Sequence, residues 1–317
     1  ELILPLPEET STEITAEDLA VRISTLTDDA YEGRGPGSEA GENSALWIAR
    51  EMERIGLEPG GEDGGWFQTV AMVEQSIDEN ASSITFNGTG SGEAMPMTLK
   101  EDAVLWTKHQ DQTDLDFTDS DLVFVGYGVV APEYDWNDYE GLDVEGKTVV
   151  MLVNDPGFAR ESEDLFKGRA MTYYGRWTYK YEEAARQGAA AAIIVHQTEP
   201  AAYGWGVVRS SWTGPQLEPD IAGDHMDQSK VIGWIQLDPA KKLFAAAGKD
   251  FDALAEAATH KGFKAVPLGV KASTGFVNSI RRQASKNVVG ILPGTEKPDE
   301  VVLFSAHWDH LGKCDAI

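Results

Sequence analysis

Apolar residues recur with helical spacing in the first sixty residues of the chain. A capping-box pattern over Thr15–Asp18 is followed by three apolar residues spaced at i, i+4 and i+7. Together they predict a helix over residues 15–26. A second helical face runs over residues 45–55 and stops at Gly56. A glycine-rich loop over residues 31–37 joins the two helices. It is interpreted as a tight connection rather than a phosphate cradle, because no Gly-Lys-Ser/Thr follows it and no strand precedes it.

Continuous apolar runs further along the chain predict buried strands. The strongest cover residues 122–127, 147–153 and 189–195. The third run follows a predicted helix over residues 177–187 that ends at Gly188. This succession of helix, glycine and strand is typical of a compact α/β module.

Two more helices and two more strands are predicted in the last third of the chain. The helices cover residues 240–247 and 251–258. The strands cover residues 287–292 and 301–306, and the Pro- and Gly-containing turn between them predicts a hairpin.

The strand predicted over residues 301–306 runs directly into His307-Trp308-Asp309-His310. Residues i and i+2 of an extended strand point to the same side, so the imidazole of His307 and the carboxylate of Asp309 can act together. Such a carboxylate can accept the second ring N–H of a metal-bound histidine and fix its orientation. The pattern therefore predicts that His307 is a metal ligand and that Asp309 orients it. The alternative is a buried histidine that is hydrogen-bonded to Asp309 for structural reasons alone.

Composition and charge narrow the function classes. The chain has 42% hydrophobic residues and nine Trp, as expected of a globular protein. With 26 basic and 53 acidic residues its net charge is −27, which disfavours nucleic-acid partners and suits a secreted or salt-tolerant protein. The one cysteine, Cys314, allows neither an intrachain disulfide nor a cysteine-based zinc site. The sequence contains no run of eighteen apolar residues, so no membrane-spanning helix is predicted. Residues 1–7 look like the start of a mature domain whose leader has been removed.

Three stretches in the correct order resemble the two-zinc aminopeptidase family, which includes bacterial leucyl aminopeptidases and glutamate carboxypeptidase-like proteins. The first contains Tyr-Glu-Gly-Arg-Gly from Tyr31 and reaches Pro59. The second, Leu-Val-Phe-Val-Gly-Tyr-Gly from Leu122 together with residues 186–195, resembles the inserted protease-associated domain. The third joins Lys-Asn-Val-Val-Gly-Ile-Leu-Pro-Gly from Lys286 to the His307-x-Asp309 motif.

The resemblance implies an α/β fold, namely an incomplete three-layer α/β/α zinc-peptidase domain with an inserted α/β protease-associated domain. Residues 1–117 and 263–317 would form the peptidase part, and residues 118–262 the insertion. The implied activity is that of an aminopeptidase, a zinc-dependent exopeptidase that hydrolyses peptide substrates with a metal-activated water. His307 would bind one of two zinc ions and Asp309 would steer its ring. The remaining ligands and the general base lie further along in the family, so the 317-residue chain alone is expected to be inactive and to expose an unfinished sheet. The implied location is periplasmic or secreted.

Several other features leave alternatives open. His310 is expected to be structural or to support the site from outside, and the remaining histidines are too scattered for a second metal site. The aromatic residues between 173 and 181 can line a substrate groove, although packing at a domain interface is favoured.

The alternative function is a peptidase-like scaffold that has lost its metals and serves as a binding module. The zinc content of the complete protein distinguishes the two, with about two ions expected for the enzyme and none for the scaffold.

Overall fold

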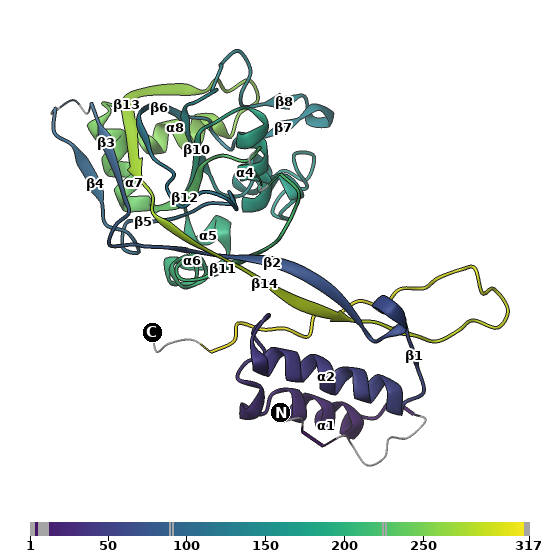
Figure 1. The fold of residues 1–317 in the computed structure, drawn as a ribbon. Helices are drawn as coiled ribbons and strands as arrows, with labels where there is room; N and C mark the ends of the chain where they lie inside the picture. The colour runs from purple at the N-terminus through teal and green to yellow at the C-terminus, as the bar shows by residue number, and fades with distance from the viewer. Residues whose placement is uncertain are drawn as a thin grey trace. The chain divides into compact units, whose positions relative to one another are not determined.

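The structure is a computed structural model that describes residues 4–5, 13–88, 90, 92–223, 225 and 227–313. The chain divides into two compact units, coloured along its length in Figure 1. Unit 1 comprises residues 1–72 and 282–317, and unit 2 comprises residues 73–281. Unit 2 thus contains the predicted insertion, residues 118–262, together with sequence on both sides of it. The three-part domain assignment itself stays a prediction.

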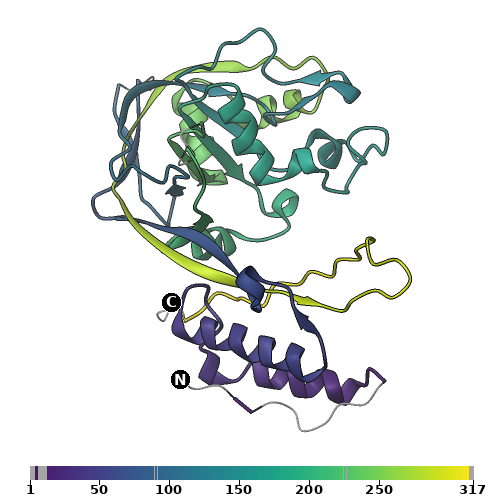
Figure 2. The same cartoon turned by 45° about the vertical axis from the view of Figure 1, so that its right-hand side comes forward.

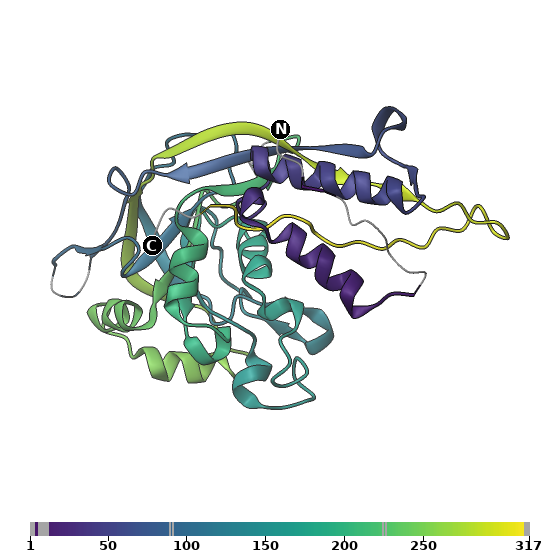
Figure 3. The same cartoon turned by 90° about the horizontal axis from the view of Figure 1, so that it is seen from below.

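Unit 1 contains the two predicted N-terminal helices. Helix α1 (Ala16–Leu26) begins with a complete capping box in which Thr15 and Asp18 bond each other's main-chain N–H. Helix α2 (Glu39–Arg54) is capped by Ser38 and is followed by Gly56, whose φ of +88° permits the chain to leave the helix. Figure 3 shows both helices from below. The remaining elements of unit 1 are the 3-10 helices η1 (Asp29–Tyr31) and η2 (Glu62–Gly64) and the paired short strands β1 (Glu58–Pro59) and β15 (Gly290–Ile291).

Unit 2 is built on an eight-stranded mixed sheet in the order β4-β3-β13-β6-β9-β10-β12-β5. Its four central strands, β6, β9, β10 and β12, are parallel, whereas β5, β13 and β4 run antiparallel to their neighbours. The strands are β3 (Ser83–Asn87), β4 (Met95–Met97), β5 (Ala103–Trp106), β6 (Phe117–Phe124), β9 (Thr148–Leu152), β10 (Ala191–His196), β12 (Val231–Gln236) and β13 (Val266–Gly275). A separate pair is formed by β7 (Val130–Ala131) and β8 (Trp136–Asn137).

Helices cover both faces of this sheet, as Figure 2 shows. One apolar cluster joins the sheet to α7 (Leu237–Ala246) and α8 (Phe251–Ala258), and a second joins it to α4 (Trp177–Arg186) and α6 (Trp205–Trp212). Shorter helices connect these elements: η3 (Pro132–Tyr134), α3 (Pro156–Arg160), η4 (Tyr173–Gly175) and α5 (Thr198–Ala201). Strands β9 and β10 are buried along their whole length, which confirms the prediction made from their apolar runs. No helix among the described residues is both long and apolar enough to cross a membrane.

Two long strands carry the chain from one unit to the other. Strand β2 (Phe67–Ile77) leaves unit 1, and β14 (Asn278–Val288) returns to it. They are neighbours in a three-stranded sheet with β11 (Gln216–Pro219) and lie side by side in Figure 1. Side-chain contacts at three levels, Gln68 with Asn287, Glu74 with Arg281 and Ser76 with Ser279, show that β2 and β14 are antiparallel.

The strand predicted over residues 301–306 is not formed, and the predicted hairpin is therefore absent from the described residues. Residues 301–304 are 80–91% exposed although all four are apolar. The apolar pattern was assigned to a buried strand, but a strand is stable only where a neighbour accepts its main-chain hydrogen bonds. No strand in the described part of the chain pairs with this segment.

Candidate metal centre

His307 and Asp309 lie close together, although the strand from which their contact was predicted is not formed. The ring Nδ1 of His307 is 2.9 Å from the main-chain oxygen of Asp309 and 3.6 Å from its carboxylate Oδ1. An Nδ1–H that donates to this main-chain oxygen leaves Nε2 with its lone pair, the form in which an imidazole binds a metal. The side chain of His307 is 79% exposed, so its ring is open to a ligand.

The glycine-rich loop of residues 31–37 holds the main chain of the motif. The N–H of His310 donates to the Arg34 oxygen, and the N–H of Gly312 donates to the Gly33 oxygen, both at 3.0 Å. Gly33 has a φ of +72°, and a Cβ at this position would lie 2.7 Å from the Gly312 oxygen. The sequence requires glycine here because of both the conformation and the close approach. The loop thus has a role beyond the tight connection expected of it.

Arg34 ties the same segment to helix α1. Its Nε donates to the main-chain oxygen of Trp308 at 2.9 Å, and its Nη1 donates to the main-chain oxygen of Leu26. Leu26 is the last residue of α1, where carbonyl groups lack helical partners and favour a cation. On the other side, Trp308 Nε1 donates to the Lys286 oxygen at 2.9 Å. Trp308, the residue between His307 and Asp309, is therefore held by two hydrogen bonds. The sequence alone did not indicate either of them.

The described residues do not assemble the ligand shell of a metal ion. Among them there is no group of three or more His, Cys, Asp or Glu side chains that could hold a metal ion. Zinc sites in proteins generally use three or four protein ligands, so His307 alone would not hold the ion. His310 takes part through its main chain, in agreement with a structural role. Cys314 lies outside the described residues.

The aromatic residues between 173 and 181 pack within unit 2. Tyr174 and Tyr173 make edge-on contacts with Tyr179, and Trp177 contacts Tyr181. Tyr179 and Tyr181 are buried, and their hydroxyls bond main-chain oxygens of Val130 and Gly233. The cluster therefore supports helix α4 on the sheet.

Taken together, the chain has a mixed α/β fold with a large sheet in unit 2 and a histidine–aspartate pair in unit 1. No protein-family model matches the sequence, and a comparison with curated proteins finds no match. Among solved structures, the chain is similar to an aminopeptidase from Aneurinibacillus sp. strain AM-1, with 16% identity and a TM-score of 0.41. The similarity covers 89% of this chain and 49% of that one, so the chain spans about half the length of the structure that it matches.

Proposed function

We propose that the chain is the N-terminal part of a zinc-dependent exopeptidase of the aminopeptidase type, with a protease-associated domain inserted within residues 118–262. The observation that carries the proposal is the contact between the glycine-rich loop and the motif. The first and third stretches of the family resemblance meet there, because Arg34 and Trp308 are 274 residues apart in the chain and hydrogen-bonded. A structural histidine would not need this support while its own ring stays exposed.

In this proposal, His307 binds zinc through Nε2 while the main-chain oxygen and the carboxylate of Asp309 fix its ring. Bound zinc supplies an activated water and polarises the peptide carbonyl. The loop around Gly33 and Arg34 keeps the main chain of the motif in place, so that the ring meets the metal without a further ordering cost. The other ligands and the general base come from the part of the protein beyond residue 317, and residues 1–317 alone have no peptidase activity. Export to the periplasm or the medium belongs to the same proposal, supported by the net charge of −27.

The test uses the complete protein that contains this chain, assayed for bound zinc and for release of 4-nitroaniline from aminoacyl substrates. The wild type is expected to hold about two zinc ions per chain. His307→Ala should lose zinc and reduce kcat/KM by more than about 100-fold, whereas Asp309→Asn should weaken zinc binding by about 10- to 100-fold.

His310→Ala is the matched control, because the hydrogen bond of His310 to the loop comes from its main chain, and the variant should retain zinc and most activity. A His307→Ala protein with full zinc content and full activity would refute the proposal. A complete protein that folds but binds no zinc would instead point to the non-catalytic scaffold.

A further inference from the structure

Unit 2 contains a cleft that the proposed zinc chemistry does not use. It has a volume of about 290 Å³ and opens where three neighbouring parallel strands end. Tyr127 follows β6, Asn154 and Asp155 follow β9, and Gln197 follows β10. Helix α8 closes the opposite side. The carboxyl ends of parallel strands are where open α/β sheets bind ligands, and this volume is near the lower end of the range for small-molecule sites, about 300–1,000 Å³.

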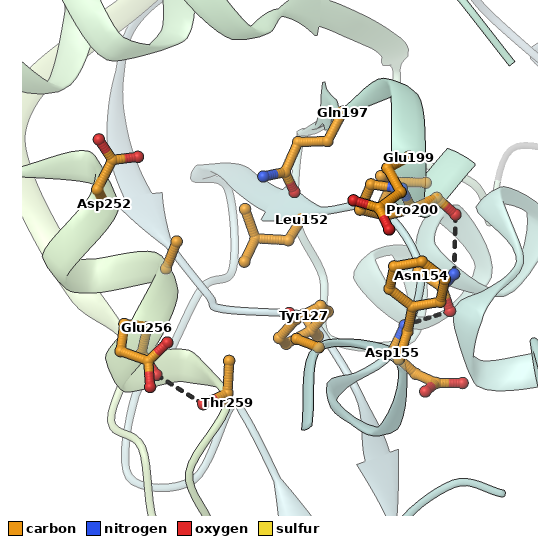
Figure 4. A pocket seen from close by; sticks show the side chains of 14 residues that line it. Tyr127, Leu152, Asn154, Asp155, Gln197, Glu199, Pro200, Asp252, Glu256 and Thr259 are labelled. Atoms are coloured by element: carbon orange, nitrogen blue, oxygen red, sulfur yellow. Dashed lines mark hydrogen bonds between the residues drawn. The ribbon is translucent and has the colours of Figure 1, made fainter. Parts of the chain in front are cut away.

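The cleft combines an apolar centre with acidic walls. Figure 4 shows Asp252 and Glu256 of α8 on one side, Glu199 on the other, and Leu152 and Tyr127 between them. Of the lining residues that the structure describes, none is Lys or Arg. An anionic ligand would therefore meet no positive side chain in the lining, whereas a cation with an apolar stem would find partners for both of its parts.

The acidic side chains of the walls keep their charges available to a ligand. Each contacts a residue outside the lining: Asp252 forms an ion pair with Lys241 at 2.8 Å, Glu199 forms one with Arg169 at 2.8 Å, and Glu256 lies 3.5 Å from the Nε2 of His260. In all three pairs both side chains are at least 40% exposed. Such solvent-exposed pairs contribute little free energy and are easily exchanged for another cation.

Beneath the cleft there are more buried acids than buried bases. Asp155 lines the cleft and is fully buried, and Lys180 and Asp138 are buried as well. Burial lowers the pKa of Lys180 to about 7, while the charges of Asp138 and Asp155 act to raise it. Burial also raises the pKa of Asp155, while hydrogen bonds from Thr172 and the charge of Lys180 act to lower it. The Asp155 carboxylate accepts from the N–H groups of Gly157 and Thr172 and from the Thr172 hydroxyl, and it adds a further acid to the lining of the cleft.

Tyr127 offers a polar group that the protein leaves unused. Its side chain is 6% exposed and lines the cleft. Lys180 lies over the ring of Tyr127, 5.6 Å from its centroid, but the hydroxyl has no hydrogen-bond partner among the described residues. The hydroxyl oxygen is not sealed from solvent, so a ligand in the cleft can replace a water as its hydrogen-bond partner. This feature is independent of the acidic walls and points to an occupant.

We propose that the cleft binds an alkylammonium group, carried either by a lysine side chain or by the amino terminus of a peptide. The aliphatic stem lies against Leu152 and Ala255, and the ammonium donates to Glu256 and to the Tyr127 hydroxyl. The site belongs to unit 2 alone and does not depend on zinc or on His307.

The test titrates the whole 317-residue chain with n-butylammonium at about 150 mM salt, where weak attraction to the overall charge is screened. Amide chemical shifts are expected to change around residues 152–159 and 252–259, with a Kd of about 1–10 mM for so small a ligand. Butyramide and butyrate, which share the stem but lack the positive charge, should bind at least about tenfold more weakly. Nα-acetyl-lysine methylamide and leucinamide then separate a lysine side chain from an amino terminus as the natural source.

Glu256→Gln should weaken n-butylammonium binding by about three- to tenfold, and Tyr127→Phe by about threefold without loss of folding, since the hydroxyl has no partner to lose. Glu140→Gln is the matched control, because Glu140 also forms an exposed ion pair in unit 2, with Lys264, but lies outside the cleft. Equal binding of butyramide, shift changes elsewhere, or an equal effect of Glu140→Gln would overturn the proposal.

Discussion

Two glycines of unit 1 share a conformation but differ in their surroundings. Gly33 has a φ of +72° and Gly64 a φ of +73°. A Cβ on Gly33 would lie against the main chain of Gly312, whereas one on Gly64 would have nothing within 4 Å. A side chain is therefore disfavoured by the left-handed φ at both positions, and only Gly33 adds a steric cost at the motif.

Gly64→Ala is expected to destabilise unit 1 by about 1 kcal/mol, the cost of an alanine in the left-handed region. Gly33→Ala should cost about 2–4 kcal/mol, because the loop must also move away from Gly312. Urea unfolding followed by tryptophan fluorescence measures both changes. Equal effects of the two substitutions would show that the loop does not hold the motif.

The sequence indicated the pair of His307 and Asp309 but not the hydrogen bonds from the glycine-rich loop that hold the motif. The i, i+2 spacing on an extended strand predicted that His307 and Asp309 act together. The two lie close together, but residues 301–306 form no strand. The main-chain oxygen of Asp309 is nevertheless closer to the ring than the carboxylate is. Gly33 and Arg34 could not be connected with the motif, because their partners lie at the other end of the sequence and main-chain contacts leave no trace in residue types.

Elements with strong local patterns were predicted well. The helix predicted over residues 251–258 is α8. The strand predicted over residues 147–153 is β9, which is one residue shorter at each end than the prediction. Local capping, glycine stops and unbroken apolar runs determine such elements without help from distant residues.

Strand β13 was missed, although its residues alternate in burial. Leu268, Val270 and Ala272 are buried in every second position. Pro267 and Gly269 argue against a strand in the sequence. They are tolerated because the register between β13 and β6 is irregular between Pro267 and Lys271.

Helices α1 and α2 are joined by one buried carboxylate. Glu51 of α2 is bonded by Arg22 of α1 at 2.7 Å and by Arg54 at 2.7 and 2.8 Å. Burial raises the pKa of Glu51, but the hydrogen bonds and charges of the two arginines outweigh it and the net pKa is lowered. Because α1 has no buried residue among those that the structure describes, this link is a main attachment of the helix.

Glu51→Gln should cost about 1 kcal/mol at pH 7, allowing for the solvent exposure of the arginines. A lowered carboxyl pKa contributes stability above the ordinary value of 4.5, and this contribution is lost as the pH falls through the folded-state pKa. The wild type should therefore lose stability between about pH 5 and 3 more steeply than Glu51→Gln. Urea midpoints across this range measure the difference. Glu53→Gln, which changes an exposed residue of the same helix, should behave like the wild type.

For the whole molecule, the apolar surface of unit 1 is the largest departure from what the sequence predicted. The four apolar residues 301–304 are exposed, and so are Leu19 and Ile23 of α1, at 51% and 59%. The pattern had assigned both segments to a core. A pattern states which residues prefer burial, but it does not provide the neighbours that bury them.

We expect the 317-residue chain to self-associate through residues 301–304 despite its net charge of −27. Val302→Lys combined with Phe304→Lys should shift sedimentation toward the monomer. Thr295→Lys combined with Ser305→Lys adds the same charge at exposed polar positions and should change little. If both double variants sediment alike, the apolar segment is not the cause.

Because the neighbouring strands β2 and β14 are the two connections between the units, they affect how the gene for this protein can be rearranged. Unit 2 is entered and left through neighbouring antiparallel strands, so both ends of residues 73–281 lie on one ribbon. Deleting that stretch leaves Met72 and Arg282 on paired strands, and a two-residue turn can close them as a hairpin. The coding segment for unit 2 is therefore portable: recombination can remove it, exchange it or place it in another host without cutting through either core.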